Sequence, residues 1–195
     1  MSGYWIQTLT HKCFDLGDPH PDQMDCETIA HVMAHTERFG AHADGYTLAE
    51  HSLHVHTLLA LRSDEIRIAG LTHDVHEVYD GFGDVLRPAK ELMPLHVREW
   101  YDGHVGRISA VVADKFGINP ELYNDPLVTR SDLIALATER DHAMGGPFPR
   151  EWGPLPNPDI KLPRLPKQVA KEKLFRLLTH YERTAGQRKL VDIGG

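Results

Sequence analysis

The chain has 195 residues, 41% of them hydrophobic, and this length and composition fit one folded domain with its own core and exclude an intrinsically disordered chain. Its formal net charge of −7 argues against polymeric nucleic acid as the main ligand, because proteins that follow a phosphate backbone carry a basic surplus. Two cysteines cannot form a disulfide framework. We recognise neither a signal peptide nor an apolar run of the roughly 20 residues that would cross a bilayer, and therefore expect a cytoplasmic protein without membrane contact.

The predicted elements are all helices. Apolar side chains recur at helical spacing after an irregular N-terminal segment, and Asp25, Ser63 and Asp125 are well suited to begin helices, the last with a proline after it. The expected helices cover 26–38, 47–62, 64–80, 92–117, 126–144 and about 167–184. The segment 145–166 holds seven of the 13 prolines and is expected to be a long loop. No alternating strand pattern is strong enough to predict a sheet, so the expected class is all-α, a compact single-domain helical bundle over 1–195.

Residues that bind metal ions are concentrated in one segment. In a helix, residues three and four positions apart share a face, so His73 and Glu77 would lie together, with Asp74 one step round. The adjacent His73 and Asp74 can direct an imidazole and a carboxylate at one point, but such a pair is expected by chance in a chain with 14 histidines. Ligands from elsewhere must complete a site, and His51 and Asp132 are well placed to supply them.

The informative signal is the order of several short segments along the chain. They are Ala49-Glu-His-Ser52, Leu71-Thr-His-Asp-Val-His-Glu77, Gly83-Asp84, Pro88-Ala-Lys90 and Arg130-Ser-Asp132. In this order, over roughly 23–144, they resemble the HD-domain phosphohydrolases, an all-helical family that binds a divalent metal. The resemblance implies that the metal ligands are His51, His73, Asp74 and Asp132. Two histidines and two carboxylates suit several ions, so the sequence does not choose among Zn²⁺, Co²⁺, Mn²⁺ and Mg²⁺.

The resemblance also implies the catalytic groups. Water that is activated by a divalent ion needs a carboxylate to take its proton or to orient it, and Glu77 matches a glutamate of the similar bacterial 5′-deoxynucleotidases. Phosphoryl transfer needs positive charge near the non-bridging oxygens, which the family pattern assigns to Lys90, expected in the loop after Asp84. Asp84 itself is either a second catalytic carboxylate or an organiser of that loop.

A narrower resemblance is to the phage dATP triphosphohydrolases. It is carried by Arg38-Phe39-Gly40, ahead of the first metal histidine, and by the stretch Asp132–Arg140. It implies that Arg38 binds phosphate and that Phe39, with the turn Gly40-Ala41, borders the base. For Phe39, packing in the core is an equally good interpretation.

Four further positions are less closely tied to the family pattern. Pro88 is expected to close the other side of the base pocket. The phage enzymes carry a lysine about one turn before the last metal aspartate, where this chain has Thr129. Arg130 is the candidate phosphate ligand in its place, although adjacent helix positions point about 100° apart. His54 and His56 do not match the pattern and are expected on the helix surface or beside the metal ligands.

The expected function is that of a metal-dependent dNTP triphosphohydrolase with a preference for dATP. It would convert dATP to deoxyadenosine and triphosphate in the host bacterial cytoplasm, and so deplete dATP for phages that replace adenine with 2-aminoadenine. Similar phage enzymes form compact oligomers, so we expect a homo-oligomer. The alternatives are a 5′-deoxynucleotidase that uses the same site on dNMPs and, from another class, a nucleotide-binding regulatory module without turnover. A nuclease is disfavoured by the charge of −7.

Overall fold

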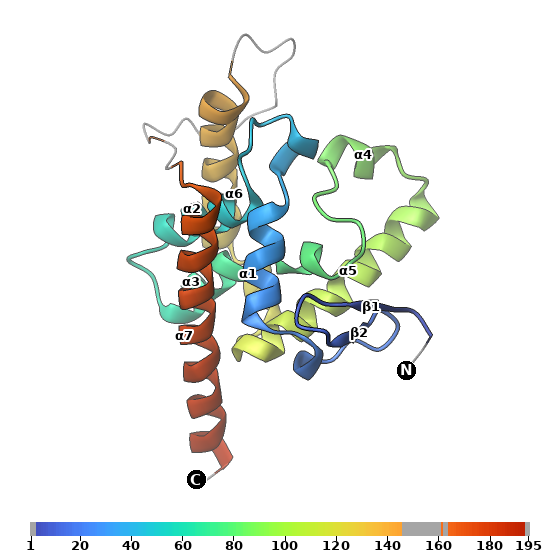
Figure 1. The fold of residues 1–195 in the computed structure, drawn as a ribbon, viewed down its shortest axis with the longest axis vertical. Coiled ribbons are helices and arrows are strands. Elements are labelled where there is room, and N and C mark those ends of the chain that lie inside the picture. The colour runs from blue at the N-terminus through green and yellow to red at the C-terminus, as the bar shows by residue number, and fades with distance from the viewer. Residues whose placement is uncertain (1–2, 146–160, 162–163, 194–195) are drawn as a thin grey trace.

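The computed structural model describes residues 3–145, 161 and 164–193, and the side chains of all of these except 188–193. The prediction of an all-α fold is confirmed: this part of the chain contains seven α-helices and a small two-stranded sheet (Figure 1). The helices are α1 (Cys26–His35), α2 (Leu48–Leu58), α3 (Asp64–Thr72), α4 (Arg87–Leu92), α5 (Leu95–Phe116), α6 (Pro126–Glu139) and α7 (Lys167–Ile193). None of the described helices is long and apolar enough to cross a membrane.

The small sheet was not predicted from the sequence. Strands β1 (Trp5–Gln7) and β2 (Cys13–Asp15) pair in antiparallel orientation, with Ile6 opposite Phe14. Strands of three residues are too short for an alternating pattern to stand out. Phe14 is fully buried. Its side chain packs in the hydrophobic core and anchors the N-terminal hairpin there.

Helices α1 and α7 form the most extensive helix pair and lie side by side (Figure 1). The inward side of α7 is a stripe at spacings of four and three residues, which keeps successive side chains on one face. Its members are Ala170, Leu174, Leu178, Tyr181 and Ala185. The sequence pattern therefore fixes which side of this long helix meets the core.

Helix α2 is the central element, because every residue from Leu48 to His56 is buried. A helix that is buried on all sides is normally apolar, so the polar side chains on this one require specific partners. The helix begins with a capping box in which the Thr47 hydroxyl accepts the Glu50 N–H and the Glu50 carboxylate accepts the Thr47 N–H. His51, a predicted metal ligand, follows directly in the first turn of this helix.

The first helix ends at His35, three residues before the predicted end. The Leu48 N–H donates to the Thr36 carbonyl, and the Arg38 N–H donates to the Tyr46 carbonyl. These bonds join the end of α1 to the start of α2 across the intervening loop. Helix α1 ends here because the backbone groups that follow it form hydrogen bonds with residues across the loop and not with residues one turn away in the helix.

The third predicted helix, 64–80, is broken. Helix α3 ends at Thr72, and Val75–Val78 forms a separate 3₁₀ turn, so His73 and Glu77 do not share a regular helix face. The expectation that one helix aligns them was wrong. Ser63 precedes α3 as predicted, but its side chain makes no capping hydrogen bond.

The later helices also differ from the predicted ranges at their ends. Lys90 lies in the short helix α4 rather than in a loop, and Pro94 separates α4 from α5. Helix α6 is capped by Asp125 as predicted but passes at Arg140–Met144 into a π-helical turn. Helix α7 continues to Ile193, beyond the predicted end at 184. Most of the predicted proline-rich loop, 145–166, lies outside the described residues.

His56 is buried against α7 rather than lying on the helix surface, and its Nε2 is 2.9 Å from the Tyr181 hydroxyl. Burial, and then the charges of Arg67 and Lys173, lower the pKa of His56 from 6.5 to about 4. Above pH 6.5 the imidazole is neutral in both states. As the pH falls toward 4, the unfolded chain takes up a proton that the folded chain does not, so the free energy of unfolding decreases.

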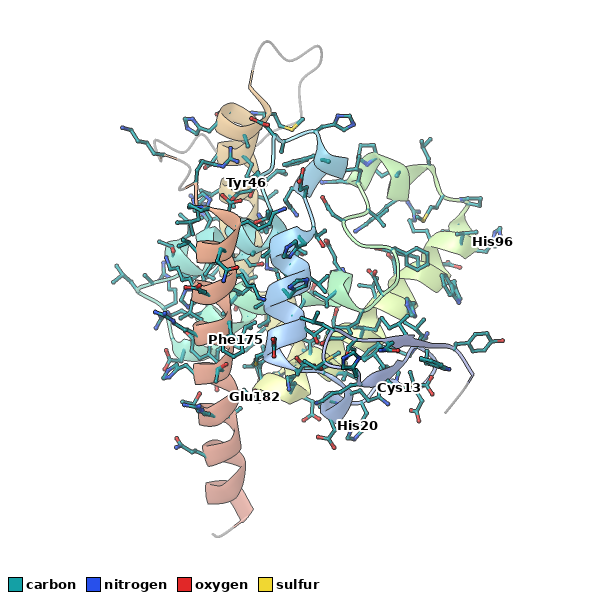
Figure 2. All side chains as sticks on the ribbon, viewed as in Figure 1. Cys13, His20, Tyr46, His96, Phe175 and Glu182 are labelled. Atoms are coloured by element: carbon teal, nitrogen blue, oxygen red, sulfur yellow. The ribbon has the colours of Figure 1, made fainter. Side chains whose placement is uncertain are left out.

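His56→Gln should remove this acid sensitivity. We expect the difference in Tm between the wild type and the variant to be largest at neutral pH and to shrink between pH 6.5 and 4, measured by circular dichroism. The control is His96→Gln, at an exposed position at the edge of the molecule (Figure 2), which should follow the wild type at every pH. If the Tm difference between His56→Gln and the wild type stayed constant with pH, this would contradict the lowered pKa of His56.

Candidate metal centre

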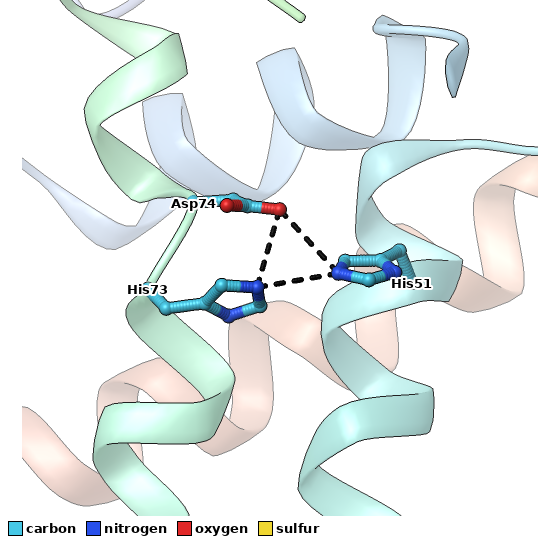
Figure 3. A group of neighbouring side chains, drawn as sticks. All are labelled: His51, His73 and Asp74. Carbon is cyan, nitrogen blue, oxygen red and sulfur yellow. Dashed lines mark hydrogen bonds and ion pairs between the residues drawn. The ribbon is translucent and has the colours of Figure 1, made fainter. Parts of the chain in front are cut away.

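Three of the predicted ligands point toward one another (Figure 3). His51 comes from α2, and His73 and Asp74 follow the end of α3. The Nε2 atoms of His51 and His73 are 3.2 Å apart, and they lie 3.4 and 3.3 Å from Oδ2 of Asp74. This group could hold a metal ion.

The hydrogen bonds on the far sides of the two imidazoles test whether an ion fits. Nδ1 of His73 lies 2.9 Å from the Gly70 carbonyl, which can only accept, so Nδ1 carries the proton. Nδ1 of His51 faces the Glu139 carboxylate in the same way. In the neutral rings, both Nε2 atoms therefore direct lone pairs at each other and at a carboxylate oxygen. Such an arrangement is repulsive without a cation and is the one expected around a divalent ion.

Asp132 joins the same two nitrogens from α6. Its Oδ1 lies 3.2 Å from Nε2 of His51 and 3.8 Å from Nε2 of His73. Burial raises the pKa of the Asp132 carboxyl, but the neighbouring imidazoles of His51 and His73, when they are protonated, outweigh burial and hold the pKa well below the usual value. The fourth predicted ligand is thus an ionised carboxylate beside the other three.

Negative charge dominates around His51. Burial and the Arg38 charge lower the pKa of its imidazole, yet the Glu139 and Asp132 carboxylates raise it to about 10. A histidine that is fully buried and still favours its cationic form marks a place where the surroundings stabilise positive charge. A divalent ion would supply that charge directly.

Arg38, the predicted phosphate ligand, is buried and paired with carboxylates. Its Nη1 lies 3.4 Å from Oδ2 of Asp74 and 3.9 Å from Oδ1 of Asp84, and its Nη2 lies 3.3 Å from Oε2 of Glu139. The guanidinium therefore links a predicted metal ligand to two other acids. Its role toward phosphate stays a prediction.

The predicted base-pocket segment Phe39-Gly40-Ala41 has a strained backbone. The φ angles of the three residues are 57°, 60° and 67°, in the left-handed region that costs non-glycine residues roughly 1–2 kcal/mol each. The Phe39 N–H donates to Oδ2 of Asp84 at 2.7 Å, which supports the role of Asp84 as an organiser. The half-buried Phe39 ring packs against Tyr46 and its neighbours, in keeping with the packing interpretation.

Glu77 is buried, and among the described residues its Oε2 has no hydrogen-bond partner. Burial, and then the charges of Asp74 and Asp84, raise the pKa of its carboxyl to about 9. The structure thus places Glu77 in the field of a predicted metal ligand with one oxygen uncommitted. Lys90 is half-buried on α4, with its Nζ 5.4 Å from the centre of the Tyr101 ring.

Two predicted substrate-binding residues take no part in the described contacts of this group. Pro88 in α4 and Arg130 in α6 are both exposed, and the contacts that join the ligand side chains do not include them. Their assignments to the base pocket and to phosphate stay predictions.

Comparison with known proteins gives one informative match. No family model matches the chain. Over 155 residues it is 30% identical to the uncharacterized protein RCAP_rcc00048 of Rhodobacter capsulatus, and the match covers 74% of this chain and 76% of that protein. The chain belongs to the RCAP_rcc00048 family.

In this member of the RCAP_rcc00048 family, one acid of the site was not predicted from the sequence. Glu139 is fully buried and contacts both His51 and Arg38. It stands seven residues after Asp132 in α6, a separation of two helical turns that places the two carboxylates on one face. That spacing was visible in the sequence and could have pointed to Glu139.

Proposed function

We propose that this protein is a metal-dependent phosphohydrolase that acts on small nucleotides. The observation that carries the proposal is the convergence of two imidazole nitrogens and two carboxylate oxygens from His51, His73, Asp74 and Asp132, with a buried acid beside them. A divalent ion held by these four residues would supply Lewis acidity toward water and toward a phosphoryl oxygen.

The surrounding residues have separate tasks in this proposal. The charge of a bound divalent ion would keep the Glu77 carboxyl ionised, and Glu77 would then accept a proton from the attacking water through the uncommitted oxygen of its buried side chain. Lys90 neutralises negative charge on the phosphoryl oxygens. Asp84 holds the backbone of Phe39 in place, and Phe39 and Pro88 border the base. A module that only binds nucleotides would not need Glu77, which argues for turnover.

The proposed substrate is dATP, which water attacks at the α-phosphorus to give deoxyadenosine and triphosphate. The ordered segments from Arg38 to Asp132 that resemble the phage dATP triphosphohydrolases support this choice. The net charge of −7 favours a small nucleotide over a nucleic-acid strand. The activity would deplete dATP during phage replication.

A 5′-deoxynucleotidase is the second candidate, and the pairing of Arg38 favours it. A triphosphate needs positive charge beyond its first phosphate, but both terminal nitrogens of Arg38 already face carboxylates. Arg130 is exposed and takes no part in the hydrogen bonds and ion pairs that join the described ligand residues. A monophosphate places a smaller demand on the available cations.

A substrate panel separates the two candidates. The full chain, loaded with Co²⁺ or Mn²⁺, is incubated with the four dNTPs, the four dNMPs and ATP, and the products are resolved by ion-exchange chromatography. We expect deoxyadenosine and intact triphosphate from dATP. Inorganic phosphate from the dNMPs would replace the proposal with the nucleotidase, and no turnover of any of them would reject both. An identically purified Asp74→Ala protein controls for contaminating phosphatases.

A further inference from the structure

The buried contacts of Glu139 point to a function beyond filling the core. We infer that Glu139 is the positioning residue of the metal centre, and that it orients His51 toward the ion while it holds Arg38 beside Asp74. The inference rests on the proposed metal site, but not on which substrate the site hydrolyses.

Each oxygen of the Glu139 carboxylate has its own partner. Oε1 lies 2.5 Å from Nδ1 of His51, and Oε2 lies 3.3 Å from Nη2 of Arg38. The Glu139 and His51 side chains are completely inaccessible to solvent. Water cannot replace the contact with His51, so Nδ1 of this imidazole depends on the Glu139 carboxylate.

The contact with His51 selects one form of its imidazole. A carboxylate accepts, so the proton lies on Nδ1 and the lone pair lies on Nε2. Nε2 is the atom that faces His73, Asp74 and Asp132. Carboxylates that accept the second N–H of a ligand histidine fix the ring and make it a better ligand.

The contact with Arg38 extends this effect to the other side of the site. Arg38 also reaches Asp74 and Asp84, so its charge lies between three carboxylates. Without Glu139, the guanidinium would lose its partner on α6 and the fixed direction of Nη2. The Glu139 carboxylate therefore orients both a predicted metal ligand, His51, and the nearby cation, Arg38.

Glu50, in the same helix α2, offers a matched control. It is a second buried glutamate, next to His51 in sequence, but its carboxylate accepts from Thr47 and from the Leu165 N–H instead. Replacing it removes a buried, hydrogen-bonded carboxylate of the same type without touching a ligand imidazole. Glu50→Gln thus measures only the loss of stability that comes from replacing a buried, hydrogen-bonded carboxylate.

The test compares Glu139→Gln, Glu50→Gln and the wild type as full chains with Co²⁺. Affinity is measured by competition with a chelator, and ligand geometry by the visible absorption of the bound ion. We expect Glu139→Gln to bind Co²⁺ about 10–100-fold more weakly, with a changed spectrum, as for other residues that support a metal ligand. Glu50→Gln should lose thermal stability but keep the wild-type affinity and spectrum.

Several results would overturn the inference. They are a wild-type affinity and spectrum in Glu139→Gln, an equal loss of affinity in Glu50→Gln, and a wild type that binds no Co²⁺. Absence of hydrolysis by a wild type that binds Co²⁺ rejects the proposed function and leaves the inference standing. If Glu139→Gln does not fold, ¹⁵N NMR of the Zn²⁺-loaded wild type decides. A proton on Nδ1 of His51 supports the role of Glu139, and a proton on Nε2 overturns it.

Discussion

Asp74→Ala is expected to abolish metal binding and hydrolysis together while the protein remains folded. The Asp74 oxygen is the point at which both ligand imidazoles meet, and Arg38 approaches it as well. Four carboxylates share this network with one guanidinium, namely those of Asp74, Asp84, Asp132 and Glu139. Removing Asp74 takes one buried negative charge out of the metal-free protein and leaves Arg38 paired with Asp84 and Glu139, so we expect the metal-free variant to unfold close to the metal-free wild type.

The measurement is thermal unfolding with and without Co²⁺, in parallel with turnover. At a Co²⁺ concentration of 100 times its Kd, the wild type should gain about 2.7 kcal/mol of stability, and Asp74→Ala should gain none. Asp102→Ala, at an exposed position in α5, is the matched control and should behave as the wild type. Turnover by Asp74→Ala in chelator-treated buffer would remove the metal from the mechanism.

Glu77→Gln should lower the rate of hydrolysis without weakening the binding of Co²⁺ or nucleotide. The amide keeps the shape of the side chain but cannot accept a proton from water, so kcat should fall by about 10²–10⁴-fold, the usual contribution of a general base. Co²⁺ affinity and KM should be retained, because His51, His73, Asp74 and Asp132 are untouched.

Steady-state kinetics with the preferred nucleotide, together with Co²⁺ titration, checks this prediction. The exposed Glu99 in α5 provides the control, since Glu99→Gln removes an equivalent carboxylate away from the site. An unchanged kcat would exclude Glu77 from the reaction. Loss of Co²⁺ binding in Glu77→Gln would make it a ligand instead of a base.

The starts of α1 and α6 were predictable because their signals are local. Asp25 accepts the Thr28 N–H and Asp125 accepts the Leu127 N–H, so each carboxylate begins the helix that follows it. The end of α1 was not predictable, because it depends on Tyr46, whose carbonyl accepts the Arg38 N–H from across a loop. A pattern of apolar side chains carries no information on such a partner.

In the candidate site, too, residues in local motifs were predictable, and residues that depend on distant contacts were not. The segments that contain His51, His73 and Asp74 could be selected from sequence, and the structure brings these residues into one group. Helical spacing did not predict the position of Glu77 correctly, because the chain forms a separate 3₁₀ turn where an unbroken helix was expected. Glu139 was overlooked because its importance comes from contacts across more than 80 residues, which no motif records.

The left-handed backbone at Phe39, Gly40 and Ala41 bears on how a substrate would be recognised. Residues in such conformations persist only where the rest of the structure determines them, and here Asp84 holds the Phe39 N–H. This segment is therefore preorganised: its ordering entropy is lost when the chain folds, not when a nucleotide arrives. A base bordered by this segment would meet a rigid wall, and selection among bases would rest on shape, with little room for the wall to adapt.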